Sequence, residues 1–232
     1  MKHARLALVA LVLANFAVPV IAQSDTGLIG GKRIAETVCI ACHGLDGQGG
    51  ATPVNPIPPR LGAQQQQYLA GKLEKYRSGA LDHPVMSAIA SSLSDDDIAN
   101  VAEWYSRILI NSPWFTQEAA MGMVDDSEDP AMTPQRWAGK VKASQVCANC
   151  HGLYGQALIA GNADRVPNLT AQNPEFIIER LHDYRSGKRQ GKQMSFISKM
   201  LSDVDIENLS RWYSEIEIDV TDPLKKLAPA SE

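Results

Sequence analysis

The stretch Cys39-Ile40-Ala41-Cys42-His43 is followed, 108 residues later, by Cys147-Ala148-Asn149-Cys150-His151. The two stretches contain all four cysteines of the 232-residue chain, and each pair is followed at once by a histidine. On a helix, residues three apart lie on one face, and the next residue projects beside them. Four cysteines in an exported protein ordinarily indicate two disulfides, but a histidine directly after each pair is typical of haem attachment.

Both motifs can perform the same chemistry. The two thiols form thioethers with the vinyl groups of a haem, and the adjacent histidine, His43 or His151, reaches the iron as the proximal ligand. A redox-active Cys-x-x-Cys does not explain a histidine in both places, and a zinc ribbon normally places its second pair about 15 to 20 residues on. The sequence therefore predicts two covalently bound haem c groups (iron), held by Cys39, Cys42, Cys147 and Cys150.

The shift of 108 residues aligns the rest of the chain as well, without a gap. Tyr76-Arg77-Ser78-Gly79 falls on Tyr184-Arg185-Ser186-Gly187, and Trp104-Tyr105-Ser106 falls on Trp212-Tyr213-Ser214. An ungapped match of this length predicts two copies of one domain. We expect a first domain over 23–110, a connector over 111–137, a second domain over 138–218 and a tail over 219–232.

Residues 1–22 have the pattern of a secretory signal peptide. A basic start and a short apolar run precede Val20 and Ala22, which fit the minus-three and minus-one positions of a cleavage site. The run is too short to cross about 30 Å of hydrocarbon, so we expect cleavage before Gln23, export to the periplasm and no membrane span in the mature chain. The formal charge of −4 would become −6, which argues against a nucleic-acid partner.

Each copy is predicted to be helical. Ser94 with Asp97 three residues later predicts a capped helix start, and Ser202 with Asp205 repeats it. Further helices are expected over 66–77 and 174–185, each ended by a glycine, and before each cysteine pair. The connector contains three prolines and an acidic run, so it is expected to be mostly irregular, with aromatic residues packing it against the domains: Trp114, Phe115 and Trp137.

The second axial ligand of each iron is predicted from the repeat. Met86 follows His43 at the same separation as Met194 follows His151. A methionine is the usual partner of histidine in electron-transfer haems, and it raises the reduction potential. The alternative is that both methionines only fill gaps in the core.

Two other residues compete for the axial position by type. Met200 falls on Ser92 under the shift, so it is assigned to packing, and His83 falls on Gly191, so it is not predicted to bind iron. With both axial positions filled there is no open site at iron, which predicts an electron carrier and no catalytic residues.

The side chains around each haem are expected to keep it rigid. Pro59 and Pro167 are expected beside the proximal histidines, where a backbone carbonyl accepts the ring hydrogen. Arg77 and Arg185 are candidates for contact with the haem propionates, with surface positions as the alternative.

This pattern resembles the cytochrome c4 family, across about Gly31 to Ile216. The resemblance is carried by the cysteine–histidine motifs, Pro59-Arg60-Leu61, Met86 and their counterparts in the second copy. It implies an all-α fold of two tandem class I cytochrome c domains, each a small helical bundle around one covalent haem. It also implies a periplasmic carrier between a membrane quinol-oxidising complex and a terminal oxidase.

Two other functions remain open at this point. Similar dihaem chains serve as the cytochrome subunit of a flavocytochrome dehydrogenase, such as sulfide dehydrogenase, and relay electrons from a flavin partner. A dihaem peroxidase would need one iron with a vacant or displaceable position, whereas both copies here keep a methionine, Met86 and Met194.

Overall fold

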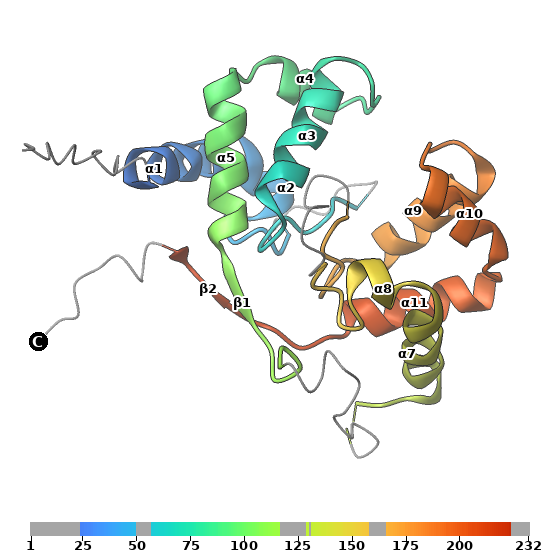
Figure 1. The fold of residues 1–232 in the computed structure, drawn as a ribbon. Helices are drawn as coiled ribbons and strands as arrows, with labels where there is room; N and C mark the ends of the chain where they lie inside the picture. The colour runs from blue at the N-terminus through green and yellow to red at the C-terminus, as the bar shows by residue number, and fades with distance from the viewer. Residues whose placement is uncertain (1–23, 50–56, 117–128, 130, 158–165, 224–232) are drawn as a thin grey trace, which may run out of the picture.

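A computed structural model describes residues 24–49, 57–116, 129, 131–157 and 166–223. The expected signal peptide and most of the acidic run in the connector lie outside these residues. Figure 1 shows two groups of helices, one from each copy.

The helices occur in the same order in both copies. The first group comprises α1 (Ser24–Ile34), the π-helical turn η1 (Ala35–Cys39), α2 (Ile40–His43), α3 (Gln66–Arg77), α4 (Met86–Ser91) and α5 (Asp95–Arg107). The second group comprises α7 (Pro134–Val146), α8 (Ala148–His151), α9 (Pro174–Ser186), α10 (Lys192–Met200) and α11 (Asp203–Ser214). The prediction of a helical fold in two copies is confirmed, and the helices expected over 66–77 and 174–185 are α3 and α9.

In each copy the first helix crosses the last at a glycine. A Cβ atom on Gly31 of α1 would lie 2.0 Å from the backbone oxygen of Asn100 in α5. A Cβ atom on Gly139 of α7 would lie 2.0 Å from the oxygen of Asn208 in α11. Backbones can approach this closely only where one of them carries no side chain, so these glycines fix the crossing that supports each cysteine motif.

Both predicted capping boxes are present. The Ser94 side chain accepts from the Asp97 backbone N–H at 3.1 Å, and the Asp97 carboxylate accepts from the Ser94 N–H at 3.1 Å. Ser202 and Asp205 form the same pair at 3.0 and 2.9 Å. These boxes start α5 and α11, whose apolar faces form the centres of the two cores.

Removing one of these caps should cost stability. We expect Ser202→Ala to lower the free energy of unfolding by about 1 kcal/mol, because one backbone donor at the start of α11 loses its partner. Guanidinium unfolding measures the change. Ser144→Ala on the exposed face of α7 is the control and should be neutral or slightly stabilising. Equal effects of the two substitutions would contradict the role of the cap.

Each copy has its own apolar core. The cluster of the first copy includes Trp104 and Tyr105, and that of the second includes Trp212 and Tyr213, all at most 2% exposed. Trp114 stacks on Tyr154 with ring centroids 5.8 Å apart, and Phe115 also packs against the second cluster, as predicted for the connector.

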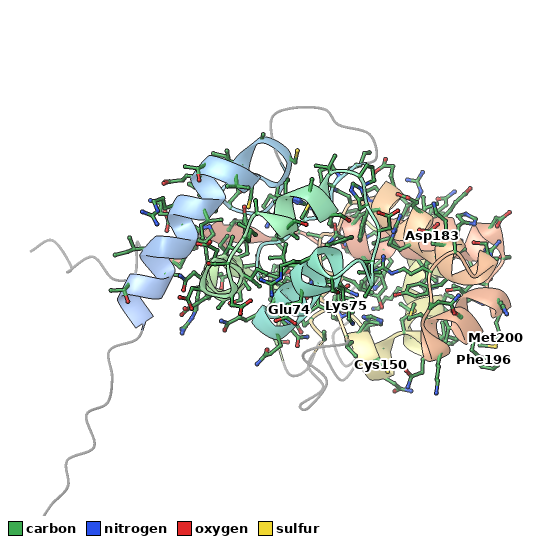
Figure 2. The ribbon with its side chains drawn as sticks, turned by 90° about the horizontal axis from the view of Figure 1, so that it is seen from above. Glu74, Lys75, Cys150, Asp183, Phe196 and Met200 are labelled. Atoms are coloured by element: carbon green, nitrogen blue, oxygen red, sulfur yellow. The ribbon has the colours of Figure 1, made fainter. Side chains whose placement is uncertain are left out.

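Two expectations about packing are wrong. Met200 is 55% exposed, because Leu201, which is 6% exposed, takes the core position. Figure 2 shows Met200 beside Phe196 on α10, at the end of the molecule away from the first copy. Trp137 is 46% exposed, because α7 begins at Pro134 and directs this residue outward. The last four residues of the expected connector are therefore helical.

The end of the chain returns to the first copy. Strand β1 (Leu109–Asn111) follows α5 directly and pairs antiparallel with β2 (Asp219–Thr221), with Ile110 opposite Val220 (Figure 1). The sequence carried no periodicity that predicted this ladder. Within the described residues, none of the helices has both the length and the apolar character needed to cross a bilayer.

Candidate haem sites

Each cysteine–histidine motif lies on a short helix at the end of a longer one. Cys39 ends η1 and His43 ends α2, whereas Cys147 follows α7 and His151 ends α8. Both histidines are 7% exposed. The structure thus places the cysteines and the histidine of each motif on consecutive turns, as the attachment of one haem requires.

The imidazoles of the two motif histidines are oriented in the same way. Nδ1 of His43 lies 2.9 Å from the carbonyl oxygen of Pro59, and Nδ1 of His151 lies 2.9 Å from that of Pro167. A carbonyl can only accept a hydrogen bond, so Nδ1 carries the proton and Nε2 keeps the lone pair that binds a metal. The predicted role of the two proline carbonyls is confirmed.

The protonation state of these rings also fits iron ligation. Burial lowers the pKa of both His43 and His151, and the hydrogen bond to the proline carbonyl only partly opposes this effect. The neutral imidazole is therefore favoured, and this is the form that binds metals.

The four cysteines form no disulfides with one another, so the disulfide interpretation does not hold. Burial raises the pKa of Cys39 and of Cys147 to about 11, so both stay protonated at neutral pH. A redox-active Cys-x-x-Cys instead uses a thiolate of low pKa. The pair spacing and the buried histidine with its lone pair available together fit covalent attachment of haem.

Helix α5 holds the backbone that follows the first motif. The indole N–H of Trp104 donates to the carbonyl of Leu45 at 3.0 Å, and the hydroxyl of Tyr105 donates to that of Gly44 at 2.9 Å. In the second copy, Trp212 and Tyr213 of α11 donate in the same way to Leu153 and Gly152, at 2.7 and 3.4 Å. These aromatic side chains fix the chain immediately after each histidine.

The predicted axial methionines occupy equivalent places. Met86 is the first residue of α4, Met194 is the third residue of α10, and both are partly buried. The backbone N–H of Met86 donates to Nδ1 of His83 at 3.2 Å, so the imidazole of His83 caps α4. That His83 does not bind iron stays a prediction.

The arginines considered for the propionates are used in ion pairs. Arg77 lies 2.6 Å from the carboxylate of Asp95, and Arg185 lies 2.6 Å from that of Asp203. Each pair ties the end of one helix to the start of the last helix of the copy. This is the surface alternative left open by the sequence.

A cationic cluster between the copies was missed. The ammonium of Lys72 lies 4.7 Å from the ring centroid of Tyr68, and its burial together with nearby Arg189 lowers the pKa of Lys72 to about 8. The second copy has a matching pair, with Arg180 5.4 Å from the Phe176 ring. An aromatic residue followed by a cation four positions later in both copies was the sequence signal.

Comparison with known proteins gives matches of two lengths. The family model described as Cytochrome c matches residues 29–108. Cytochrome c-554(548) of Halomonas halodenitrificans is 44% identical over 71 residues, which is 29% of this chain and 81% of that protein. These matches correspond to a single copy.

Longer matches span both copies. Cytochrome c4 of Pseudomonas aeruginosa is 28% identical over 75% of this chain and 82% of its own length. A protein of Stutzerimonas stutzeri named thiosulfate dehydrogenase electron acceptor is 27% identical over 81% of this chain and 82% of its own length. The crystal structure of reduced recombinant cytochrome c4 from Pseudomonas stutzeri has the same fold, with a TM-score of 0.59 at 21% identity, over 82% of this chain and 98% of that one.

Proposed function

The chain belongs to the cytochrome c family as a cytochrome c4-like dihaem electron carrier, and from this premise we propose which partners it serves. It accepts electrons in the periplasm from a quinol-oxidising complex and passes them to a terminal oxidase. The observation that supports the electron-carrier role, on which these partners depend, is that both copies hold their histidine in one orientation and repeat the methionine at one separation.

The proposed iron ligands are His43 with Met86 and His151 with Met194, and the thioether bonds are formed by Cys39, Cys42, Cys147 and Cys150. When bound, haem c supplies an iron that cycles between the ferrous and ferric states. A thioether sulfur favours the ferrous state, so both centres should have a high potential. With a histidine and a methionine both bound, the iron would have no open coordination position, so each site would exchange only electrons.

The chain's own contribution is rigidity. Electron transfer is fast when the two oxidation states have nearly the same geometry, and here each histidine is fixed by a proline carbonyl. The hydrogen bonds from Trp104 and Tyr105 hold the backbone after the first motif. Lys72 and Arg189 add positive charge between the copies.

A second candidate is acceptance of electrons from a dehydrogenase. The similar protein of Stutzerimonas stutzeri is named a thiosulfate dehydrogenase electron acceptor, which favours a donor that oxidises inorganic sulfur compounds. Alternatively, the chain is the cytochrome subunit of a flavocytochrome dehydrogenase such as sulfide dehydrogenase, and its electron donor is a flavin-containing partner. In each case this chain would relay electrons, and the partner would carry out the chemistry.

Stopped-flow reduction of the oxidised holoprotein distinguishes the donors. Membranes containing a quinol-oxidising complex, supplied with quinol, should reduce both haems, and a terminal oxidase should reoxidise them. Purified thiosulfate dehydrogenase with thiosulfate is the parallel donor. Reduction by quinol membranes only at the uncatalysed rate would overturn the first proposal, and efficient reduction by the dehydrogenase would then establish the second.

A further inference from the structure

Two buried glutamines join the copies in a reciprocal way. The side-chain oxygen of Gln64 accepts from the backbone N–H of Asn168 at 2.8 Å, and its amide nitrogen donates to the carbonyl of the same residue at 3.1 Å. In the same way, the side-chain oxygen of Gln172 accepts from the backbone N–H of Arg60 at 2.7 Å, and its amide nitrogen donates to the carbonyl of Arg60 at 3.1 Å. Each glutamine is 5% exposed, and each clamps one backbone residue of the other copy.

Neighbouring side chains strengthen both clamps. The side-chain nitrogen of Asn173 donates to the carbonyl of Pro58 at 2.6 Å, and that of Gln65 donates to the carbonyl of Val166 at 2.8 Å. Asn173 corresponds to Gln65 under the repeat, and Val166 corresponds to Pro58. The segments 58–60 and 166–168 are therefore each held by the opposite copy.

The clamped N–H groups belong to the peptide units that orient the histidines. The carbonyl of Pro167 and the N–H of Asn168 form one peptide unit, whose oxygen accepts from Nδ1 of His151 and whose N–H donates to Gln64. A continuous hydrogen-bonded chain thus runs from the histidine ring of the second copy, through one peptide group, to a side chain of the first.

The mirror arrangement serves the first copy. Nδ1 of His43 donates to the carbonyl of Pro59, and the N–H of the same peptide unit, from Arg60, donates to Gln172. Because the chain is duplicated and the clamps cross between copies, each histidine is connected to a glutamine of the opposite domain.

From this geometry we propose that Gln64 and Gln172 are cross-domain positioning residues. Gln64 sets the electron-donating strength of His151, and Gln172 sets that of His43. Each domain thereby tunes the reduction potential of the haem carried by the other. The inference rests on the proposed ligation of iron by the two histidines.

The direction of the effect follows from the hydrogen-bonded chain. Hydrogen bonds in a chain polarise one another, so a glutamine oxygen on the peptide N–H makes the peptide carbonyl a stronger acceptor. A stronger acceptor at Nδ1 raises the basicity of the imidazole and stabilises ferric iron. Removing the glutamine should therefore raise the potential of the haem in the opposite domain.

The test uses the holoprotein with Gln64→Leu, which removes both hydrogen bonds at nearly constant volume. The control is Gln67→Leu, the same change at an exposed position three residues along the chain. Potentiometric titration followed by NMR of the haem methyl groups resolves the two centres. We expect the potential of the second haem to shift upward and that of the first to move no more than in the control.

The reciprocal variant Gln172→Leu should shift the first haem instead. Equal shifts of both haems, or no shift of either, would overturn the inference, because a residue that only joins the domains has no reason to act on one centre. If Gln64→Leu separates the domains, Gln64→Asn decides, since it keeps an amide in the interface but withdraws it from the Asn168 peptide.

The two proposals fail in different ways. The NMR spectrum of the reduced protein reports ligation directly, because the haem ring current shifts the ring protons of a coordinated histidine strongly upfield. If that signal is present and the potentials do not respond to Gln64, the cross-domain effect is wrong and the electron-carrier function stands. Absence of histidine ligation would overturn the ligand assignment itself.

Discussion

Met194→Ala should remove half of the near-infrared charge-transfer band that sulfur-ligated ferric haem produces. The potential of the second haem should fall by roughly 0.2 V, within the range of about 0.8 V that axial ligands span. At about 59 mV per tenfold change, this is more than a thousandfold shift of the ferric-to-ferrous ratio at a fixed potential. Absorption spectra and potentiometric titration measure both effects.

Met200 provides the matched control. It lies on the same helix, α10, and is 55% exposed, so Met200→Ala should leave the band and both potentials unchanged. If Met194→Ala kept the full band, the methionine would be a core residue and the second axial ligand would have to be found elsewhere.

Gly31→Ala should cost about 3 kcal/mol of the free energy of unfolding of the first domain. The new Cβ atom would lie 2.0 Å from the backbone oxygen of Asn100, and a backbone clash of this kind can only be relieved by separating α1 from α5. Guanidinium unfolding of the holoprotein, followed at the haem of that domain, gives the change.

The control for this substitution is Gly71→Ala on α3. A Cβ atom there meets nothing within 4 Å, so alanine should stabilise the helix by about 0.5 to 1 kcal/mol. A loss below about 1 kcal/mol for Gly31→Ala would mean that the helix crossing adapts, and that the glycine does not fix the support of the cysteine motif.

The sequence predicted features that depend on local or repeated signals. The capping boxes at Ser94 and Ser202 each join two residues three positions apart. The sequence pattern that predicts such a box therefore names the same two residues that form its hydrogen bonds. The contact between each histidine and a proline carbonyl was predicted because a rigidly held haem needs an acceptor for the ring hydrogen of its proximal histidine. Axial ligation by the methionines follows the same reasoning and stays a prediction.

Features that depend on how the two copies meet were not predicted. Gln64 and Gln172 are equivalent under the repeat, but each contacts a residue of the opposite copy, and no pattern within one copy indicates a contact across the interface. The β2 strand depends on a long return of the chain to β1. Met200 was assigned to packing because its counterpart under the shift is Ser92, whereas in the structure the buried position belongs to Leu201.

The most direct test of the central claim is the haem content of the purified protein together with its ferric near-infrared spectrum. If each copy encloses one tethered iron between imidazole and thioether, pyridine haemochrome analysis will give two haems per chain, and the spectrum will show the sulfur charge-transfer band at the intensity of two centres. One haem per chain, or two haems without that band, would contradict the account.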